Sequence, residues 1–206
     1  MNLLTQNAKM KKTSTENNAR IYNFSIPAYK TRSGKITCPF ADTCIKYCYA
    51  QKGNYTRFPK IQQLMEEKYK ITKQDNFILL MNEEIQKKKA THIRIHDSGD
   101  FYSIKYLIKW IDIATQNKDV IFYAYTKSIP FFKGAKQGKP IIKVPSNLKI
   151  IFSEGSKRDI LINNNKDRHA RIFKDVTTLL NNGYIDASNN DLLAITDNKK
   201  VGLVYH

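Results

Sequence analysis

Alternating hydrophobic and polar residues divide the chain into short predicted strands. In the two clearest segments, a large apolar side chain occupies every second position, which is typical of a strand with one buried face. The predicted strands are residues 21–26, 92–98, 119–126, 148–153, 192–196 and 201–205. We expect the last two to form a hairpin around a turn at Asp197 and Asn198.

Between the strands, apolar residues recur every three or four positions, the period of a helix with one buried face. Helices are predicted at residues 59–69, 77–85, 103–114 and 168–180. Strands joined by helical crossovers imply parallel pairing in right-handed units. A closed eight-stranded barrel takes about 250 residues, and this chain has 206. The sequence therefore predicts an α/β fold, an open and partial parallel β/α barrel of about five to six strands.

Two segments fall outside this pattern. Residues 1–19 are polar and lack periodicity, so we expect a flexible arm. Residues 20–206 are expected to form one α/β domain. Within it, residues 131–144 are rich in glycine and lysine and predict a long basic loop.

The charge of the chain narrows the choice of partners. Lys and Arg number 35 against 18 Asp and Glu, a net charge of +17. Such an excess favours nucleic acids or other polyanions as partners. No apolar run approaches the roughly 18 residues of a membrane span. We therefore expect a cytoplasmic protein with no membrane partner.

All three cysteines lie in the segment 37–53, at Cys38, Cys44 and Cys48. A looping segment can bring three such thiols to one point. Three closely spaced cysteines can hold an iron–sulfur cluster that leaves one iron open to a cosubstrate. A structural zinc site needs a fourth ligand, for which His92, His96 and His169 are available. A disulfide fits a reduced compartment poorly, so a cluster, zinc and unliganded thiols stay open.

Polar residues follow the predicted strands, and the carboxyl ends of parallel strands meet at one edge of a sheet. We expect a cofactor site there, because polar side chains gather at that edge. The candidate cofactor-binding residues are Tyr47, His96, Ser98, Gly99, Asp100, Lys127, Ser153 and Glu154. A structural role is the alternative: Asp97, Ser98 and Asp100 could cap the next helix, and His96 could be a core residue.

Three motifs carry a resemblance to known proteins. The clustered cysteines, with Tyr47 just before the last, resemble the cluster loop of radical SAM enzymes, although the spacing is longer than the C-x3-C-x2-C of that family. CPFADTCIKYCYAQKG, IRIHDSGDFYS and VIFYAYTKS, in that order, resemble the phage gene product 88 family, a radical-SAM-like group. The resemblance spans roughly residues 21–155.

The resemblance implies a partial barrel and a [4Fe-4S] cluster whose open iron binds and cleaves S-adenosylmethionine. It implies that Tyr47 lies near the adenine and that Ser98, Gly99 and Asp100 hold the methionyl amino group. Ser153 and Glu154 would contact the ribose or the carboxylate. A phage protein of this kind would act in the host cytoplasm with an external reductant such as flavodoxin or ferredoxin.

Three functional hypotheses follow. The first is a radical-SAM-like iron–sulfur enzyme that acts on an anionic substrate such as a nucleic acid or nucleotide. The second is a basic nucleic-acid-binding protein with a structural zinc site. The third is a family member that keeps the cluster and has lost turnover.

Overall fold

The fold is an open, curled, parallel half-barrel. The computed structural model describes residues 1–134 and 142–205. Seven strands form one sheet in the order β1-β2-β3-β4-β5-β7-β6, and every pair is parallel. The strands are β1 (Ile21–Phe24), β2 (His92–Ile95), β3 (Ile121–Thr126), β4 (Leu148–Ser153), β5 (His169–Phe173), β6 (Ile185–Asp186) and β7 (Lys200–Val204). The predicted partial barrel is confirmed, with seven strands instead of five or six.

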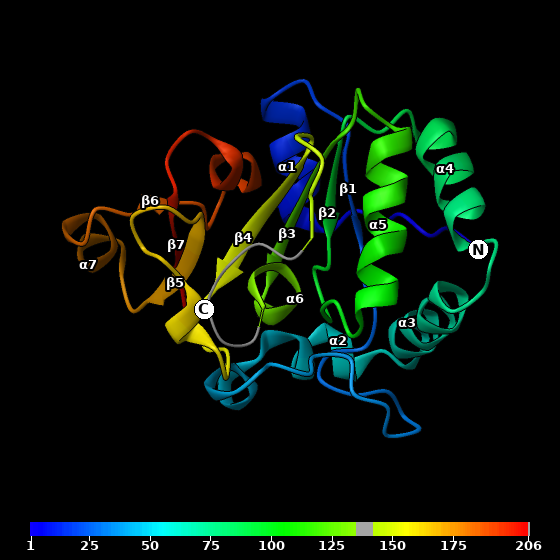
Figure 1. The fold of residues 1–206 in the computed structure, drawn as a ribbon, viewed down its shortest axis with the longest axis horizontal. Coiled ribbons are helices and arrows are strands. Elements are labelled where there is room, and N and C mark those ends of the chain that lie inside the picture. Colours follow the sequence, from blue (N-terminus) through cyan, green and yellow to red (C-terminus); the bar gives the residue numbers. More distant parts are fainter. Residues whose placement is uncertain (135–141, 206) are drawn as a thin grey trace.

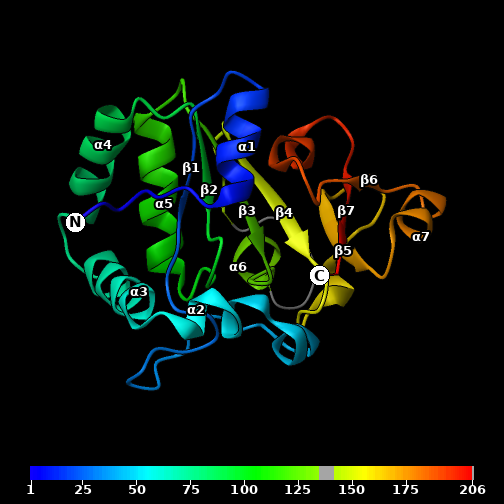
Figure 2. The ribbon, with the colours of Figure 1, turned by 180° about the vertical axis from the view of Figure 1, so that it is seen from behind.

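Helices cover the two faces of the sheet unequally. The α-helices are α1 (Ala8–Glu16), α2 (Asn54–Arg57), α3 (Pro59–Thr72), α4 (Phe77–Lys88), α5 (Ile104–Gln116), α6 (Pro130–Lys133) and α7 (Val176–Asn181). The 3-10 helices are η1 (Thr43–Tyr47), η2 (Tyr49–Gln51), η3 (Asp159–Leu161) and η4 (Asp191–Ile195). Helix α5 lies in front of the first strands in Figure 1, with α4 beside it, whereas α1 lies in front of the sheet in Figure 2.

Hydrophobic packing on the outer, convex face follows from the alternation in the strands. Phe24, Ile93 and Phe122 point to this face and are fully buried. Trp110 of α5 meets the ring of Phe24 at 5.3 Å and the ring of Phe77, from α4, at 5.7 Å. Aromatic pairs of this kind add about 0.5 to 1.5 kcal/mol to the energy of area burial. This core holds the first three strands in register.

The inner, concave face contains a buried ion-pair network. Arg94 of β2 reaches Asp191 of η4, with 3.1 Å between Nη1 and Oδ1. Tyr123 of β3 donates a hydrogen bond to Asp191 Oδ2 (2.6 Å), and Lys9 of α1 is 2.7 Å from Oδ1. The network therefore joins the N-terminal helix, two central strands and the C-terminal part of the chain.

The first 19 residues differ from the predicted flexible arm. Leu3 and Leu4 are buried in the main core, and Thr5 exchanges two backbone hydrogen bonds with Asn23 of β1. Helix α1 then lies along the concave face. The hydrophobic pattern of the sequence did not predict helix α1, because this helix buries only two of its side chains.

Two predictions in the C-terminal third are wrong. Residues 168–180 form β5, a turn and α7 instead of one helix, and residues 192–196 form η4 instead of a strand. The final strand β7 is confirmed, but it pairs in parallel with β5 and β6, so there is no hairpin. Apolar residues on a short strand and on the following short helix happen to match a helical period.

The predicted basic loop lies largely outside the described residues. Its first residues form α6, and residues 135–141 are not described. Across the described parts of the chain, no helix has the length and apolar character needed to cross a membrane.

The buried network predicts a pH-dependent contribution to stability. Burial alone would raise the pKa of Asp191, but Arg94 and Lys9, with the hydrogen bonds from Lys9 and Tyr123, lower it to about 2. The stabilisation is thus fully present above the unfolded pKa of about 3.9 and is lost as the pH falls toward 2. We expect Asp191→Asn to lower the free energy of unfolding at pH 7 by about 3 kcal/mol, measured by urea denaturation.

Asp119→Asn is the matched control, because Asp119 is exposed. The difference in free energy of unfolding between wild type and Asp191→Asn should become smaller as the pH falls from 4 toward 3. An equal loss of unfolding free energy in Asp191→Asn and Asp119→Asn, or a difference that does not change with pH, would contradict this account.

Candidate cysteine-lined site

The cysteine loop crosses the carboxyl edge of the half-barrel, from the end of β1 to the end of β4. Thr37 Oγ1 donates a hydrogen bond to Pro27 O (2.7 Å) at one end of the loop. Asp42 N donates to Gly155 O (3.0 Å), just beyond β4. In Figures 1 and 2 this loop and its two 3-10 helices run beneath the ends of the strands.

A glycine lets the loop approach β4 closely. Gly155 has φ of 92°, and a Cβ there would lie 3.2 Å from Thr43 Oγ1 and 3.3 Å from Cys44 Cβ. An added Cβ would need these neighbours to move by a few tenths of an ångström. This close approach positions Cys44 against the sheet.

The three cysteines line one cavity of about 170 Å³ at this edge. The ends of β2, β3 and β4 form its floor, together with the loops that follow them. Of the eight other predicted site residues, seven also line it: Tyr47, His96, Ser98, Gly99, Asp100, Lys127 and Ser153. Glu154 does not, because its side chain turns away to Arg171, with 2.6 Å between Oε2 and Nε.

The thiols are free and two of them are strongly affected by burial. Burial, followed by the carboxylate of Asp100, raises the pKa of Cys38 to about 12, although Tyr29 N–H donates to its Sγ at 3.3 Å. Burial also raises the pKa of Cys44, and the charge of Lys127 opposes that shift. A cationic centre between the thiols would offset the cost of burying them as thiolates.

The three thiols share the cavity, but they are not arranged as a metal centre. In the described residues, no group of three or more His, Cys, Asp or Glu side chains has the arrangement that holds a metal ion.

A family comparison can be set beside this geometry. The family model for gene product 88 matches residues 1–205. The chain belongs to the gene product 88 family. Two curated relatives are both called Gene 88 protein, one from Mycobacterium phage D29 with 30% identity over 104 residues and one from Mycobacterium phage L5 with 29%. The aligned part covers 45% of this chain and 43% of each relative, less than half of their length. No solved structure matches the chain.

In this gene product 88 chain, Asp100 ties two strand ends together. Its Oδ1 accepts hydrogen bonds from Thr126 Oγ1 (2.6 Å) and Phe101 N (2.7 Å), and its Oδ2 accepts from Lys127 N (2.8 Å). Burial raises its pKa, and these hydrogen bonds oppose the shift. Asp100 is not the helix cap that one interpretation predicted, since Ser103 caps α5.

Ser98 and Gly99 also have contacts within the protein. Ser98 Oγ donates to Ile26 O at 3.0 Å. Gly99 has the expected positive φ, 85°, and a Cβ there would lie 2.3 Å from Ile26 Cγ1. The close approach at this glycine is therefore made by the end of β1. Neither residue caps the helix that follows.

His96 occupies the junction between the cavity and the core. It has a positive φ of 70° and is 3% exposed. Its Nε2 is 2.8 Å from Tyr106 Oη, while its Nδ1 has no hydrogen-bond partner within the described residues. Burial lowers the pKa of His96 to about 3, so the ring is neutral at physiological pH.

Several buried polar atoms of the residues that line this cavity have no hydrogen-bond partner within the described residues. Five buried side-chain nitrogen or oxygen atoms of the described residues have no partner, and three belong to residues that line it: Arg94 Nε, His96 Nδ1 and Tyr125 Oη. Buried polar atoms are nearly always hydrogen-bonded, and exceptions concentrate where a ligand or water completes the bonding. These three atoms are left for water or a ligand in the cavity to satisfy.

The sequence did not predict the role of Asp97, which accepts hydrogen bonds from several elements. Asp97 Oδ2 accepts hydrogen bonds from Tyr55 Oη (2.7 Å), Asn7 Nδ2 (3.0 Å) and Asn23 Nδ2 (3.2 Å). Tyr49 Oη also donates to the Asp97 carbonyl oxygen. The only local signal was the position of Asp97 at the end of a predicted strand. Its partners lie far away in the sequence.

The packing at Gly99 can be tested with a matched pair. Gly99 and Gly34 both have positive φ, at 85° and 81°, but an added Cβ meets Ile26 at the first position and nothing within 4 Å at the second. Alanine strains the backbone at both sites. We expect Gly99→Ala to lower the free energy of unfolding by about 1 to 3 kcal/mol more than Gly34→Ala, measured by urea denaturation. Equal losses would show that the close contact with Ile26 is unimportant.

Proposed function

We propose that the cavity holds a [4Fe-4S] cluster through Cys38, Cys44 and Cys48, and that it binds S-adenosylmethionine for radical chemistry on an anionic substrate. One observation carries the proposal. Every cysteine of the chain lines a single cavity at the carboxyl edge of a parallel half-barrel, beside nearly all the polar residues expected to meet a cosubstrate.

The number of thiols favours a cluster over a single zinc ion. A structural zinc ion takes four ligands, and the chain has three cysteines. Among the described residues, no group of three or more His, Cys, Asp or Glu side chains is arranged to hold a metal ion, so no fourth zinc ligand is in place. Three cysteines match a cluster that leaves one iron open to a cosubstrate.

The cluster, when bound and reduced by a flavodoxin or ferredoxin, would supply an electron to S-adenosylmethionine. The chain's own residues bind and orient the cosubstrate. Lys127 Nζ donates to Ser153 Oγ at 2.8 Å, and both groups can be redirected to a carboxylate or a ribose. The ring of Tyr47 offers a flat face for the adenine. The neutral imidazole of His96 adds one free hydrogen-bonding nitrogen.

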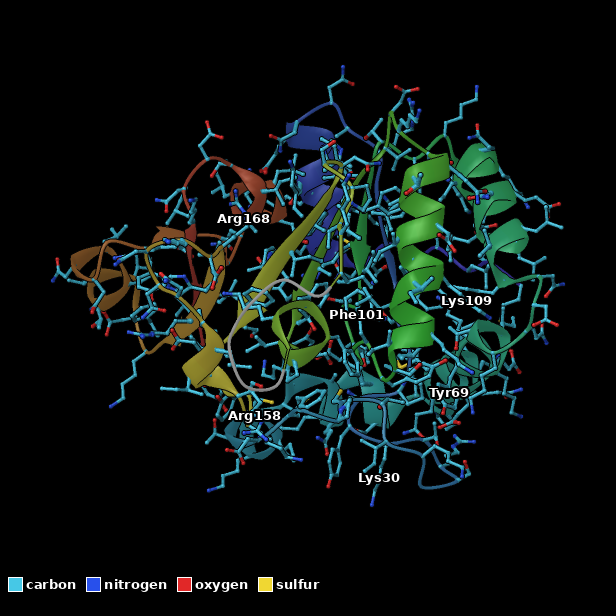
Figure 3. All side chains as sticks on the ribbon, in the orientation of Figure 1. Lys30, Tyr69, Phe101, Lys109, Arg158 and Arg168 are labelled. Carbon is cyan, nitrogen blue, oxygen red and sulfur yellow. The ribbon has the colours of Figure 1, made fainter. Side chains whose placement is uncertain are left out.

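The charge of the chain supports an anionic substrate. The net charge is +17, and the exposed side chains of Lys30 and Arg158 lie at the lower edge in Figure 3, beside the cysteine loop. A positive edge around the cavity would draw in polyanions and phosphorylated molecules. As a phage protein, it would work in the host cytoplasm, where such reductants are found.

Metal and sulfide analysis tests the cluster. We expect protein purified without oxygen to contain about four irons and four sulfides per chain, and Cys44→Ala to lose most of both. Thr43→Ala is the matched control, since Thr43 is an exposed neighbour on the same loop and should retain the wild-type content.

One zinc per chain without sulfide would contradict the proposal. That result would favour the alternative, a nucleic-acid-binding protein with a structural zinc site, in which DNA or RNA affinity falls steeply with salt.

Cosubstrate affinity separates an active enzyme from a family member without turnover. We expect calorimetry on the iron-loaded protein to show binding of S-adenosylmethionine. Ser153→Ala should weaken it about threefold to tenfold, by the loss of one hydrogen bond, while Ser33→Ala, at an exposed serine far along the loop, should not. An intact cluster with no cosubstrate binding would favour the silent family member.

A further inference from the structure

A second and larger cavity, of about 490 Å³, opens beside the cysteine-lined cavity. The two share part of their walls, so a ligand in one touches residues of the other. The shared residues are Tyr47, Tyr49, Arg94, Asp97, Ile172 and Leu203. The volume is within the range of about 300 to 1,000 Å³ that holds small ligands. We refer to it as the outer cavity.

Tyrosine rings dominate the aromatic lining of the outer cavity. Tyr47 and Tyr205 meet edge to face, with ring centroids 6.4 Å apart. Tyr49 and Tyr55 do the same at 5.9 Å. All four line the cavity. Rings in this arrangement present flat faces and hydroxyl groups, which suit a planar heterocycle.

Lys52 is the cation of this lining that is available to a ligand. Of the other two, Lys9 is paired with Asp191, and Arg94 is paired with Asp191 and Asp97. Lys52 is exposed at the rim and takes part in no ion pair of the described residues. An anionic group in the outer cavity would therefore meet Lys52.

Arg94 supplies a buried polar donor at the boundary of the two cavities. Its Nη1 is paired with Asp191 and Asp97, at 3.1 Å and 3.5 Å, whereas its buried Nε has no partner among the described residues. The guanidinium lies over the ring of Tyr125, 4.9 Å from the centroid, and Tyr125 lines only the cysteine-lined cavity. Arg94 is thus the side chain that has a buried donor to offer to a ligand in either cavity.

We propose that the outer cavity is the substrate subsite and that it binds a nucleotide, with the base among the rings of Tyr49, Tyr55 and Tyr205 and the phosphate near Lys52, while Tyr47 serves the cosubstrate in the neighbouring cavity. This inference rests on the proposed function, because a nucleotide in the outer cavity is a substrate only if the neighbouring cavity holds the proposed cluster. The binding itself requires no cluster. A cavity of about 490 Å³ has the size of a small-molecule site and is too small for a base-paired duplex, so the proposed ligand is a free nucleotide.

Equilibrium binding tests the subsite. The probes are the four nucleoside 5'-monophosphates, the matching nucleosides, inorganic phosphate and a single-stranded oligonucleotide, added to the full chain with and without iron and sulfide. At least one monophosphate should bind about tenfold or more tightly than its nucleoside and than phosphate alone. Tyr205→Ala should weaken it by about tenfold, and Lys52→Ala by about threefold to tenfold.

Lys46→Ala is the matched control. Lys46 is exposed on the same loop and lines neither cavity, so an unchanged affinity is expected. If Lys46→Ala and Lys52→Ala weakened nucleotide binding equally, both lysines would act only through the overall positive charge of the protein. That result would overturn the inference. Phosphate binding as tightly as every nucleotide would also overturn it, and so would an oligonucleotide binding far more tightly than any mononucleotide.

The two proposals fail separately. Nucleotide binding in a chain that takes up no iron or sulfide would support the subsite and leave the cluster proposal refuted. An intact cluster with no affinity for any mononucleotide would overturn only the subsite.

Discussion

The ion pair between Arg94 and Asp191 is the interaction on which both the fold and the site depend. A half-barrel leaves its concave face open, and here that face contains an arginine on its second strand. A buried guanidinium is tolerated only when charges and hydrogen bonds compensate it. Asp191 compensates it from the far end of the chain, and Lys9 brings α1 onto the same carboxylate. Arg94 of this network also lines both cavities.

Residues at the carboxyl edge divide into those that build the site and those that face a ligand. Asp100, Ser98 and Gly99 use their polar groups or their small size to lock the ends of β1, β2 and β3 together. Among the described residues, the buried atoms left without partners include Arg94 Nε and His96 Nδ1. Satisfied hydrogen bonds thus fix the strand ends, and a few polar atoms beside them are left for water or a ligand to satisfy.

The sequence predicted the first half of the fold well, because alternating strands and amphipathic helices there are long enough to show their period. It failed where elements are short: β5 and α7 together imitated one helix, and η4 imitated a strand. For the site, parallel pairing correctly gathered the cysteines, Lys127 and Ser153 at one edge. The roles of Asp97 and Asp191 could not be predicted, because their partners lie far away in the chain; Arg94 is 97 residues from Asp191, and Lys9 is further still.

The central claim is that one centre bridges the three thiols of this cavity. The most direct test is a crystal structure of protein purified and crystallised without oxygen, with anomalous diffraction measured at the iron edge. The account predicts compact iron density within bonding distance of Sγ of Cys38, Cys44 and Cys48, with one iron not bound by the protein. A single zinc peak, or iron bound elsewhere with the three thiols free, would contradict it.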